Sequence, residues 1–296
     1  MQPAEAPALC PGADPAILER MTERPGAGRW RTSAALRPLV AEFWVWRTAG
    51  GPPGTHQGVP GGHLTVILCI DGDVELLRKP DPGRGPGRFT ASAAGLHAVP
   101  AVIATGAPQA GLQLPLTWRG ARTLLGLPAA ELAGDVIDLA ELWPDTGSLL
   151  DRLHAAPTWA TRCALLDAHL CRLAARRTAA DGPPAEIGRA WDRLVASGGT
   201  ARVTELAADV GWSARHLGDR LRRETGLGTK TAARVIRFER ACTLLRSADR
   251  PALTDVAADC GFADQQHLAR EFRALAGTTA GAWLAERVSG LSVSPA

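Results

Sequence analysis

The chain contains one element twice: TELAADVGW begins at Thr204, and TDVAADCGF begins at Thr254. The two copies stay 50 residues apart through their glycines, Gly211 and Gly261, and the aromatic residues that follow, Trp212 and Phe262. One inserted residue then raises the offset to 51 for the rest of the second copy. A repeated pattern of this kind marks a structural unit that is used more than once.

Each copy predicts a helix, a tight turn and a second helix. In the first copy, apolar residues at helical spacing precede Gly211, which suits the left-handed turn that ends a helix. Ser213 then caps the second helix, and Asp264 takes the same place in the second copy. This order is the helix-turn-helix pattern, whose second helix enters the DNA major groove. A plain helical bundle with two similar hairpins is the alternative, but two copies in matching register favour a DNA-binding unit.

The outward faces of the two second helices supply the candidate DNA contacts. Leu217 and Leu221 anchor one helix, and Leu268 and Phe272 anchor the other, so the opposite faces point outward. Arginine suits the paired acceptors on guanine, glutamine suits adenine, and aspartate can accept from cytosine. The predicted base-reading residues are Arg215, Asp219, Gln265, Gln266 and Arg270. The predicted phosphate-contacting or helix-start residues are Ser213, His216, Arg222, Arg223, Arg234, Arg237, Asp264, His267 and Arg273.

We expect the two modules to be unequal. Gly218 weakens the first recognition helix, because glycine in a helix interior costs roughly 1 kcal/mol. Asp219 is repelled by phosphates unless it pairs with an arginine, so it is expected to orient an arginine rather than to touch a base. For His216 and His267, packing within the module is an alternative to phosphate contact.

The stretches GWSARHLGDRLRRETGL and GFADQQHLAREFR resemble the C-terminal domain of AraC/XylS-type transcription regulators. The resemblance extends from about Arg189 to Arg287, and the chain departs from it at Thr229 and Ala280, where the family usually has proline. It implies a sequence-specific transcription regulator whose partner is a double-stranded DNA operator. A small-molecule effector, RNA polymerase and a second copy of the chain are further candidate partners, and we expect no cofactor and no enzymatic activity.

Composition agrees with a globular protein of two domains. The chain has 296 residues and a net charge of only +3. Between Ser213 and Arg240, however, eight basic residues stand against three acidic ones, as a phosphate-facing surface requires. The six cysteines form no C-x-x-C pair, and the sequence pattern leads us to expect neither a signal sequence nor a membrane span. We therefore expect reduced thiols and a cytoplasmic location.

The predicted fold class is α+β, with a β-rich sensory-type domain followed by an all-α domain. Frequent short apolar stretches between Gly and Pro residues favour a sandwich or partial barrel. We expect residues 63–79 to form a hairpin around Asp71-Gly72-Asp73, and residues 135–143 to form a short helix. The predicted organisation is a loose arm (1–33), a β-rich regulatory domain (34–155), a helical linker (156–182), the double helix-turn-helix domain (183–290) and a tail (291–296).

The N-terminal half shows no sequence motif for metal binding or nucleophilic catalysis. His56, His63 and His97 lie there near Cys69, but none has metal-ligand spacing. Cys69 belongs to an apolar strand that disfavours its thiolate, and no nucleophile has a base at motif spacing. The tryptophans could line an effector pocket or form an aromatic core; they are Trp30, Trp44, Trp46 and Trp118. The competing functions are an interaction protein with degenerate modules, and an N-terminal enzyme with a DNA-binding tail.

Overall fold

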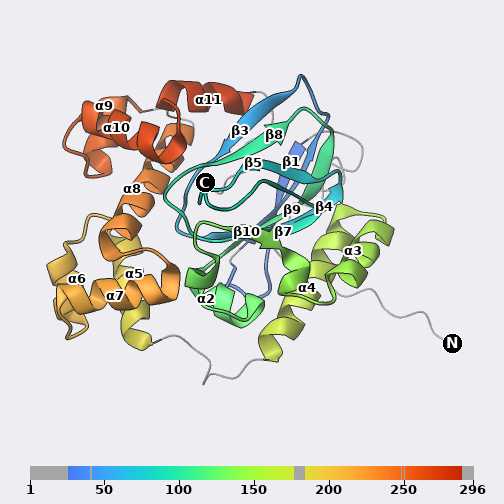
Figure 1. Cartoon of the computed structure of the whole chain (residues 1–296), viewed down its shortest axis with the longest axis horizontal. Helices are drawn as coiled ribbons and strands as arrows, with labels where there is room; N and C mark the ends of the chain where they lie inside the picture. The colour runs from blue at the N-terminus through green and yellow to red at the C-terminus, as the bar shows by residue number, and fades with distance from the viewer. Residues whose placement is uncertain (1–25, 41, 177–183, 248, 250, 289–296) are drawn as a thin grey trace.

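The computed structural model describes residues 26–40, 42–176, 184–247, 249 and 251–288. Strands build the N-terminal half, and the C-terminal half is helical in its described part (Figure 1). The fold class is therefore α+β, with a β-rich domain followed by a domain that contains two helix-turn-helix units.

Ten strands make up the sheets of the described N-terminal half. They are β1 (Gly26–Arg31), β2 (Glu42–Thr48), β3 (Gly54–Gly58), β4 (Leu64–Asp71), β5 (Val74–Arg78), β6 (Gly87–Phe89), β7 (Ala91–Ala94), β8 (Ala101–Thr105), β9 (Gln109–Leu116) and β10 (Val136–Asp138). The helices of this half are α2 (Trp118–Gly120), the π-helical turn η1 (Ala121–Leu125), the 3-10 turns η2 (Ala129–Leu132) and η3 (Leu139–Glu141), α3 (Thr146–Ala155) and α4 (Trp159–Ala175).

The helices of the C-terminal half follow the repeat. They are α5 (Ala185–Ala196), α6 (Val203–Asp209), α7 (Ala214–Thr225), α8 (Thr229–Arg246), α9 (Leu253–Asp259), α10 (Gln265–Ala276) and α11 (Ala280–Val288). The first unit is α6 with α7, and the second is α9 with α10. Gly211 and Gly261 both have φ +71°, as the left-handed turns of the two units require. The long helix α8 joins the two units (Figure 1).

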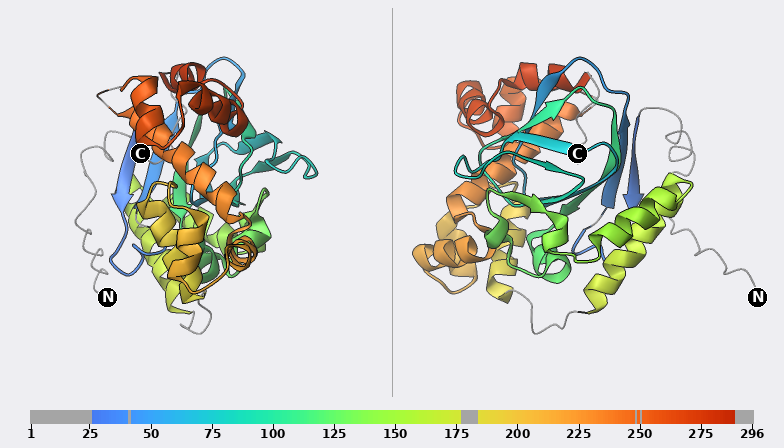
Figure 2. Two further views of the ribbon diagram at one scale, coloured as in Figure 1. Left: turned by 90° about the vertical axis from the view of Figure 1, so that its left-hand side faces the viewer. Right: turned by 45° about the vertical axis from the view of Figure 1, so that its right-hand side comes forward.

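Two antiparallel sheets face each other in the β-rich domain. One has six strands in the order β1-β2-β9-β4-β7-β10, and the other has four in the order β3-β8-β5-β6. Val74 and Leu76 of the smaller sheet pack with Cys69 and Val136 of the larger one. The domain is therefore a two-layer sandwich, with α3 and α4 beside the larger sheet (Figure 2).

The larger sheet has two different faces, because side chains alternate along a strand. On β9, Leu112 and Leu114 are fully buried in the main core, which also includes α4. Gln109 and Gln113 lie on the other face, toward the smaller sheet. One face is thus uniformly apolar, whereas the face inside the sandwich carries polar side chains.

The hairpin predicted for residues 63–79 does not form. β4 pairs with β7 and β9, whereas β5 pairs with β6 and β8, so the chain passes from one sheet to the other between them. Gly72 makes this passage in a left-handed conformation, with φ +71°. Leu68 and Cys69 are both fully buried, because the strand is covered on both faces where it leaves its sheet. An apolar strand followed by a turn with glycine is compatible both with a hairpin and with a crossing from one sheet to the other, so the sequence does not distinguish them.

Residues 135–143 also differ from their prediction as a helix. Val136–Asp138 pairs with β7 as a short strand, and only a 3-10 turn follows it. Val136 and Ile137 are β-branched and suit this strand. The Asp138 side chain accepts a hydrogen bond from the Ala140 N–H at 2.8 Å and so starts the turn.

Two predicted boundaries fall elsewhere in the structure. β1 lies within the segment expected to be a loose arm, and it pairs with β2 because Trp30 is buried in the core. Residues 1–25 of that segment lie outside the described residues. α4 occupies most of the expected linker, yet Leu166 and Leu170 are fully buried in the core, so this helix is part of the β-rich domain.

Most of the predicted break at residues 181–184 and the whole tail, 291–296, also lie outside the described residues. The two domains on either side of this break contact each other directly.

Gly218 in α7 offers a test of the local helix argument. A Cβ at this position would meet only Thr229 Oγ1, at an ordinary 3.7 Å. Gly218→Ala should therefore raise the free energy of unfolding by roughly 0.5–1 kcal/mol, since glycine has the greater backbone entropy in the unfolded chain. Chemical denaturation measures this change. A destabilised variant would show that α7 needs the glycine for close packing.

Candidate nucleic-acid interface

The predicted recognition helices, α7 and α10, begin in the same way. The Ser213 hydroxyl accepts a hydrogen bond from the His216 N–H at 3.2 Å, and the Asp264 carboxylate accepts one from the His267 N–H at 2.6 Å. Both residues therefore cap their helices, as the sequence pattern predicts.

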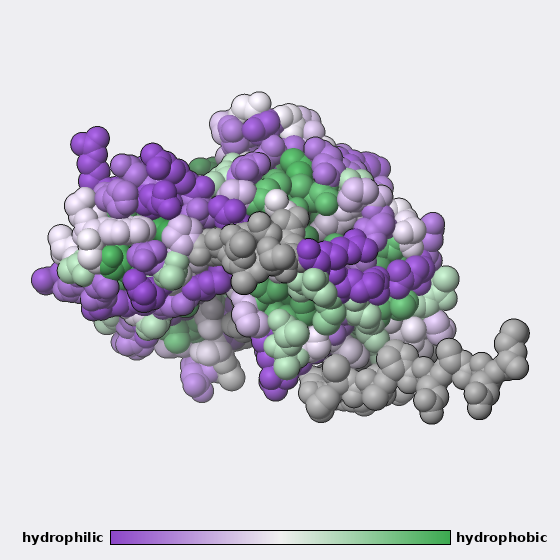
Figure 3. Space-filling model, turned by 90° about the horizontal axis from the view of Figure 1, so that it is seen from below, coloured by the Kyte–Doolittle hydropathy of each residue, from purple (hydrophilic) through white to green (hydrophobic). Residues whose placement is uncertain are grey.

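The side chains predicted to read bases lie on exposed helix faces. Leu217 and Leu221 in α7 are buried, as are Leu268 and Phe272 in α10. The exposed residues on the opposite faces and beside them are Arg215, Asp219, Arg222, Arg223, Gln265, Gln266, Arg270 and Arg273. Seen from below, the side of the molecule that α6 and α7 occupy is mainly hydrophilic (Figure 3). Each unit thus presents one polar, largely basic surface.

Asp219 Oδ1 lies 3.7 Å from Arg222 Nη1 on the same helix. An exposed pair of this kind contributes only about 0–1 kcal/mol to stability. Its position fits a residue that orients an arginine next to DNA.

His216 and His267 pack within their units. The His216 ring lies edge-on to Trp212 with the ring centres 4.7 Å apart, and the His267 ring lies edge-on to Phe262 at 5.4 Å. The Ala263 N–H also donates a hydrogen bond to His267 Nδ1 at 3.2 Å. The equivalent contacts hold each turn against its recognition helix.

Arg234 and Arg237, predicted as phosphate contacts, have partners inside the protein. Arg234 donates two hydrogen bonds to the Glu271 carboxylate, at 2.8 and 3.1 Å, and so ties α8 to α10. The Arg237 guanidinium lies 5.6 Å from the centre of the Phe262 ring. These contacts stabilise the second unit, and the sequence pattern does not reveal them.

Two arginines of the β-rich domain contact the DNA-binding domain, one at α5 and one at α7. Arg119 donates to both carboxylate oxygens of Asp192 in α5, each at 2.9 Å. Arg122 donates to the Glu224 carboxylate in α7 at 2.9–3.1 Å, and Glu224 is buried. A carboxylate that is buried with a bidentate arginine becomes costly when the arginine is removed. The position of α7 therefore depends on the β-rich domain.

A third contact reaches α8, the helix that joins the two units. His63 Nδ1 lies 3.0 Å from Glu239 Oε1, and the Gly62 N–H donates to Glu239 Oε2 at 2.9 Å. A Cβ on Gly62 would lie only 3.1 Å from the same oxygen, so the glycine permits the close approach. Burial acts to raise the pKa of the Glu239 carboxyl, but His63 and the two hydrogen bonds lower it below its ordinary value. Glu239 is therefore held as an anion.

A cavity of about 180 Å³ lies between the two sheets. Its polar lining includes His56, His63, His97, Gln109 and Gln113. Trp46 also lines it, whereas Trp30 and Trp118 are core residues with exposed fractions of 2% and 1%. The alternation of polar and apolar residues along β9 could have indicated that Gln113 faces away from the main core. Which residues share the cavity with it depends on how the two sheets pack.

Burial controls the titration of two side chains beside this cavity. It lowers the pKa of His97 to about 4, and His63 acts in the same direction, although a hydrogen bond to the Val99 carbonyl opposes the shift. It also raises the pKa of the Cys69 thiol to about 12. His97 is therefore neutral near pH 7, and Cys69 is a poor nucleophile there.

The shift at His97 predicts a loss of stability in mild acid. Above pH 6.5 the ring is neutral in both the folded and the unfolded chain, so its full contribution is present. Between pH 6.5 and about 4 only the unfolded chain binds the proton, which lowers the free energy of unfolding by up to about 3 kcal/mol. Urea denaturation at several pH values should show this slope, and His97→Gln should reduce it. An equal slope in that variant would assign the effect to other groups.

The described residues contain no group of three His, Cys, Asp or Glu side chains arranged to bind a metal ion. Within the same residues, no helix combines the length and apolar character needed to cross a membrane.

Known proteins resemble the chain in its helical half and in the overall order of its two domains. A family model described as a helix-turn-helix domain, of the AraC type, matches residues 187–286. ToxT from Vibrio cholerae superposes with a TM-score of 0.50 and 10% identity, over 82% of this chain and 97% of ToxT. A DNA-binding transcriptional dual regulator from Escherichia coli K-12 has 19% identity and a TM-score of 0.30, over 34% of this chain and 96% of its own. No curated protein matches this sequence.

The likeness to ToxT shows a shared fold, in which a β-rich domain precedes the helical one. The family match spans α5 to α11 and includes both helix-turn-helix units. Residues 187–286 therefore form a helix-turn-helix domain of the AraC type, the kind found in DNA-binding transcription regulators.

Proposed function

We propose that α7 and α10 read successive major grooves of one operator sequence, and that the β-rich domain senses a small effector and controls them. The polar faces of the two recognition helices carry this proposal, because each has arginines or glutamines that can bond base edges. In this arrangement Arg215, Gln265, Gln266 and Arg270 read bases, and Asp219 orients Arg222.

The spacing of the units supports readout of two grooves. α8 has 18 residues, which at 1.5 Å per residue gives a length of roughly 27 Å. Successive major grooves on one face of DNA lie about 34 Å apart, a distance that this helix and its flanking units can span. The bidentate pair of Arg234 with Glu271 stiffens the connection.

The contacts between domains support control by the β-rich domain. Arg119, Arg122 and His63 bind residues of α5, α7 and α8, so each part of the DNA-binding domain that they hold can respond to the sandwich. Transcription regulators of the AraC type are not enzymes, and burial makes the Cys69 thiol a poor nucleophile. A second copy of the chain and RNA polymerase remain candidate partners, and the protein would act in the cytoplasm.

A charge-reversal experiment distinguishes DNA binding from the alternative, an interaction protein with degenerate modules. The variant Arg215→Glu/Arg270→Glu should bind a random duplex pool more than about 100-fold more weakly than the unaltered chain. Arg78→Glu/Arg88→Glu makes the same charge change at exposed arginines of the smaller sheet and should bind almost normally. Fluorescence anisotropy measures each affinity. Equal losses in the two variants, or an unaltered chain that does not bind DNA, would reject the proposal.

A further inference from the structure

The cavity inside the sandwich has a lining of mixed character. Its apolar part comes from both sheets and includes Ile67, Leu76 and Ile103. Its polar part consists of imidazole rings, amides and hydroxyl groups, among them Ser92 and Gln113. A purely apolar cavity of this size stays dry, whereas these groups offer hydrogen bonds to a bound molecule.

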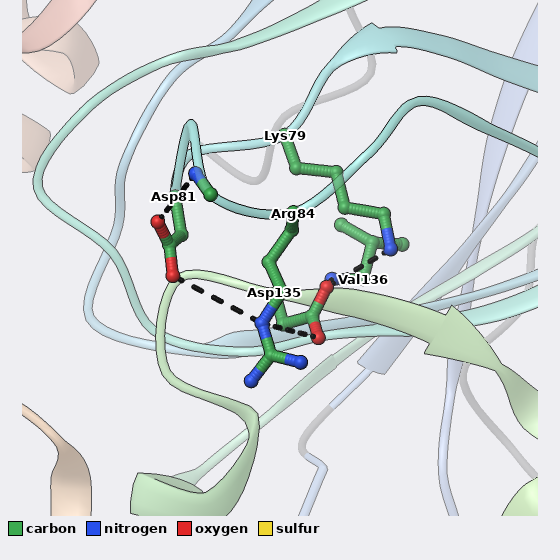
Figure 4. A network of polar contacts seen from close by, with 6 residues as sticks. Lys79, Asp81, Arg84, Asp135 and Val136 are labelled. Carbon is green, nitrogen blue, oxygen red and sulfur yellow. Dashed lines mark hydrogen bonds and ion pairs between the residues drawn. The ribbon is translucent and has the colours of Figure 1, made fainter.

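Among the described residues that line the cavity, none is Lys, Arg, Asp or Glu. Two charged residues of opposite sign adjoin the lining in sequence: Lys79 precedes the lining residue Pro80, and Asp135 precedes the lining residue Val136. Lys79 Nζ lies 3.0 Å from one oxygen of Asp135, and Arg84 Nε lies 3.4 Å from the other (Figure 4). Asp135 thus pairs with both Lys79 and Arg84.

Neither His97 nor His63 adds an unbalanced charge. His97 is neutral near pH 7, and its Nδ1 donates to the Val99 carbonyl at 2.7 Å, so Nε2 is an acceptor. A proton on His63 would already be balanced by Glu239. A charged ligand would lose its hydration without gaining a counter-charge, which is strongly unfavourable.

The volume limits the size of the ligand. A cavity of about 150 Å³ accommodates benzene, and this one measures about 180 Å³. It therefore suits one ring with a small polar substituent.

His63 connects this cavity to the DNA-binding domain. It lines the cavity, and its Nδ1 is engaged by Glu239 of α8, which leaves Nε2 for a ligand. We propose that the cavity binds an uncharged, hydrogen-bonding molecule about the size of one aromatic ring, and that His63 couples its occupancy to Glu239. The coupling part rests on the proposed regulatory function, whereas the ligand class does not.

The ligand class is tested with matched probes on the full chain without DNA. Benzamide and benzoate have nearly the same shape but differ in charge, as do benzyl alcohol and benzylammonium. Calorimetric titration should show that each neutral probe binds at least about tenfold more tightly than its charged counterpart. Equal or tighter binding of the charged probes contradicts the proposal. Failure of both neutral probes to bind at millimolar concentration also contradicts it, because the cavity then holds water only.

An introduced charge provides the converse test. Gln113→Lys should shift the preference toward benzoate by at least about tenfold, because it places an ammonium group in the cavity. Thr55→Lys adds the same group at an exposed position of β3 outside the lining and should change nothing. If Gln113→Lys does not fold, the probe pairs on the unaltered chain still decide the question.

The coupling is tested from the other side of the contact. Glu239→Ala should weaken benzamide binding by at least about fivefold, because coupling between two sites is reciprocal and Glu239 orients His63. Glu271→Ala is the control: it removes a carboxylate of α10 that is also paired, with Arg234, and should leave the affinity for benzamide unchanged. Equal affinities in the two variants would disprove the coupling. Because no DNA is present, this result is independent of whether the chain binds an operator.

Discussion

Raising the salt concentration from 50 to 200 mM should weaken binding of the chain to duplex DNA by about 10³-fold. This loss follows if six or more phosphates are neutralised, because bound DNA releases its condensed counterions. The exposed basic residues available for these contacts are Arg215, Arg222, Arg223, Lys230, Arg240, Arg270 and Arg273. Arg234 has a partner in Glu271 and is expected to contribute less to the slope.

Anisotropy titrations at four or five salt concentrations give the slope directly. Arg223→Ala should reduce it by about one phosphate contact while weakening all sequences alike. An affinity that is constant between 50 and 200 mM would refute an interface based on this basic surface.

Arg270→Ala should cost about 1–3 kcal/mol of specific binding, which is roughly 5- to 150-fold, and should relax sequence preference in one half of the site. Arg270 is exposed on α10, above the buried anchors Leu268 and Phe272. Its fork of donors suits the two acceptors on guanine. Gln266→Ala should have a similar effect at a neighbouring base pair.

Asp219→Ala provides the contrasting variant in the first unit. Asp219 is exposed and lies next to Arg222, so its removal should change affinity little, or even raise it on non-specific DNA. Titration of both variants against a selected site and a scrambled duplex compares the two units. If Asp219→Ala abolishes binding and Arg270→Ala has no effect, the first unit dominates and our ranking is wrong.

The sequence predicted the helical domain in detail because its determinants are local. The left-handed glycines Gly211 and Gly261, and the caps Ser213 and Asp264, act within a few residues of the turns that they make. Periodic apolar residues then decide which helix face is buried, and therefore which side chains are exposed.

The β-rich domain was predicted less completely because strand partners are distant in sequence. The residues of β4 and β5 fit a hairpin, but the structure places them in different sheets. The contacts between domains could not be predicted for the same reason, because their partners are also distant in sequence. Arg122 pairs with Glu224, and His63 pairs with Glu239, across more than 100 residues. No local pattern identifies such pairs.

Selection of bound sites from random duplex DNA, with the full chain, tests whether both recognition helices read DNA. If α7 and α10 read successive major grooves, selected sites should contain two conserved blocks whose centres are about 10–10.5 base pairs apart. Arg270→Ala should erase the preference in one block and leave the other intact. A single block that Arg270→Ala does not alter, or no enrichment at all, would contradict readout by two recognition helices.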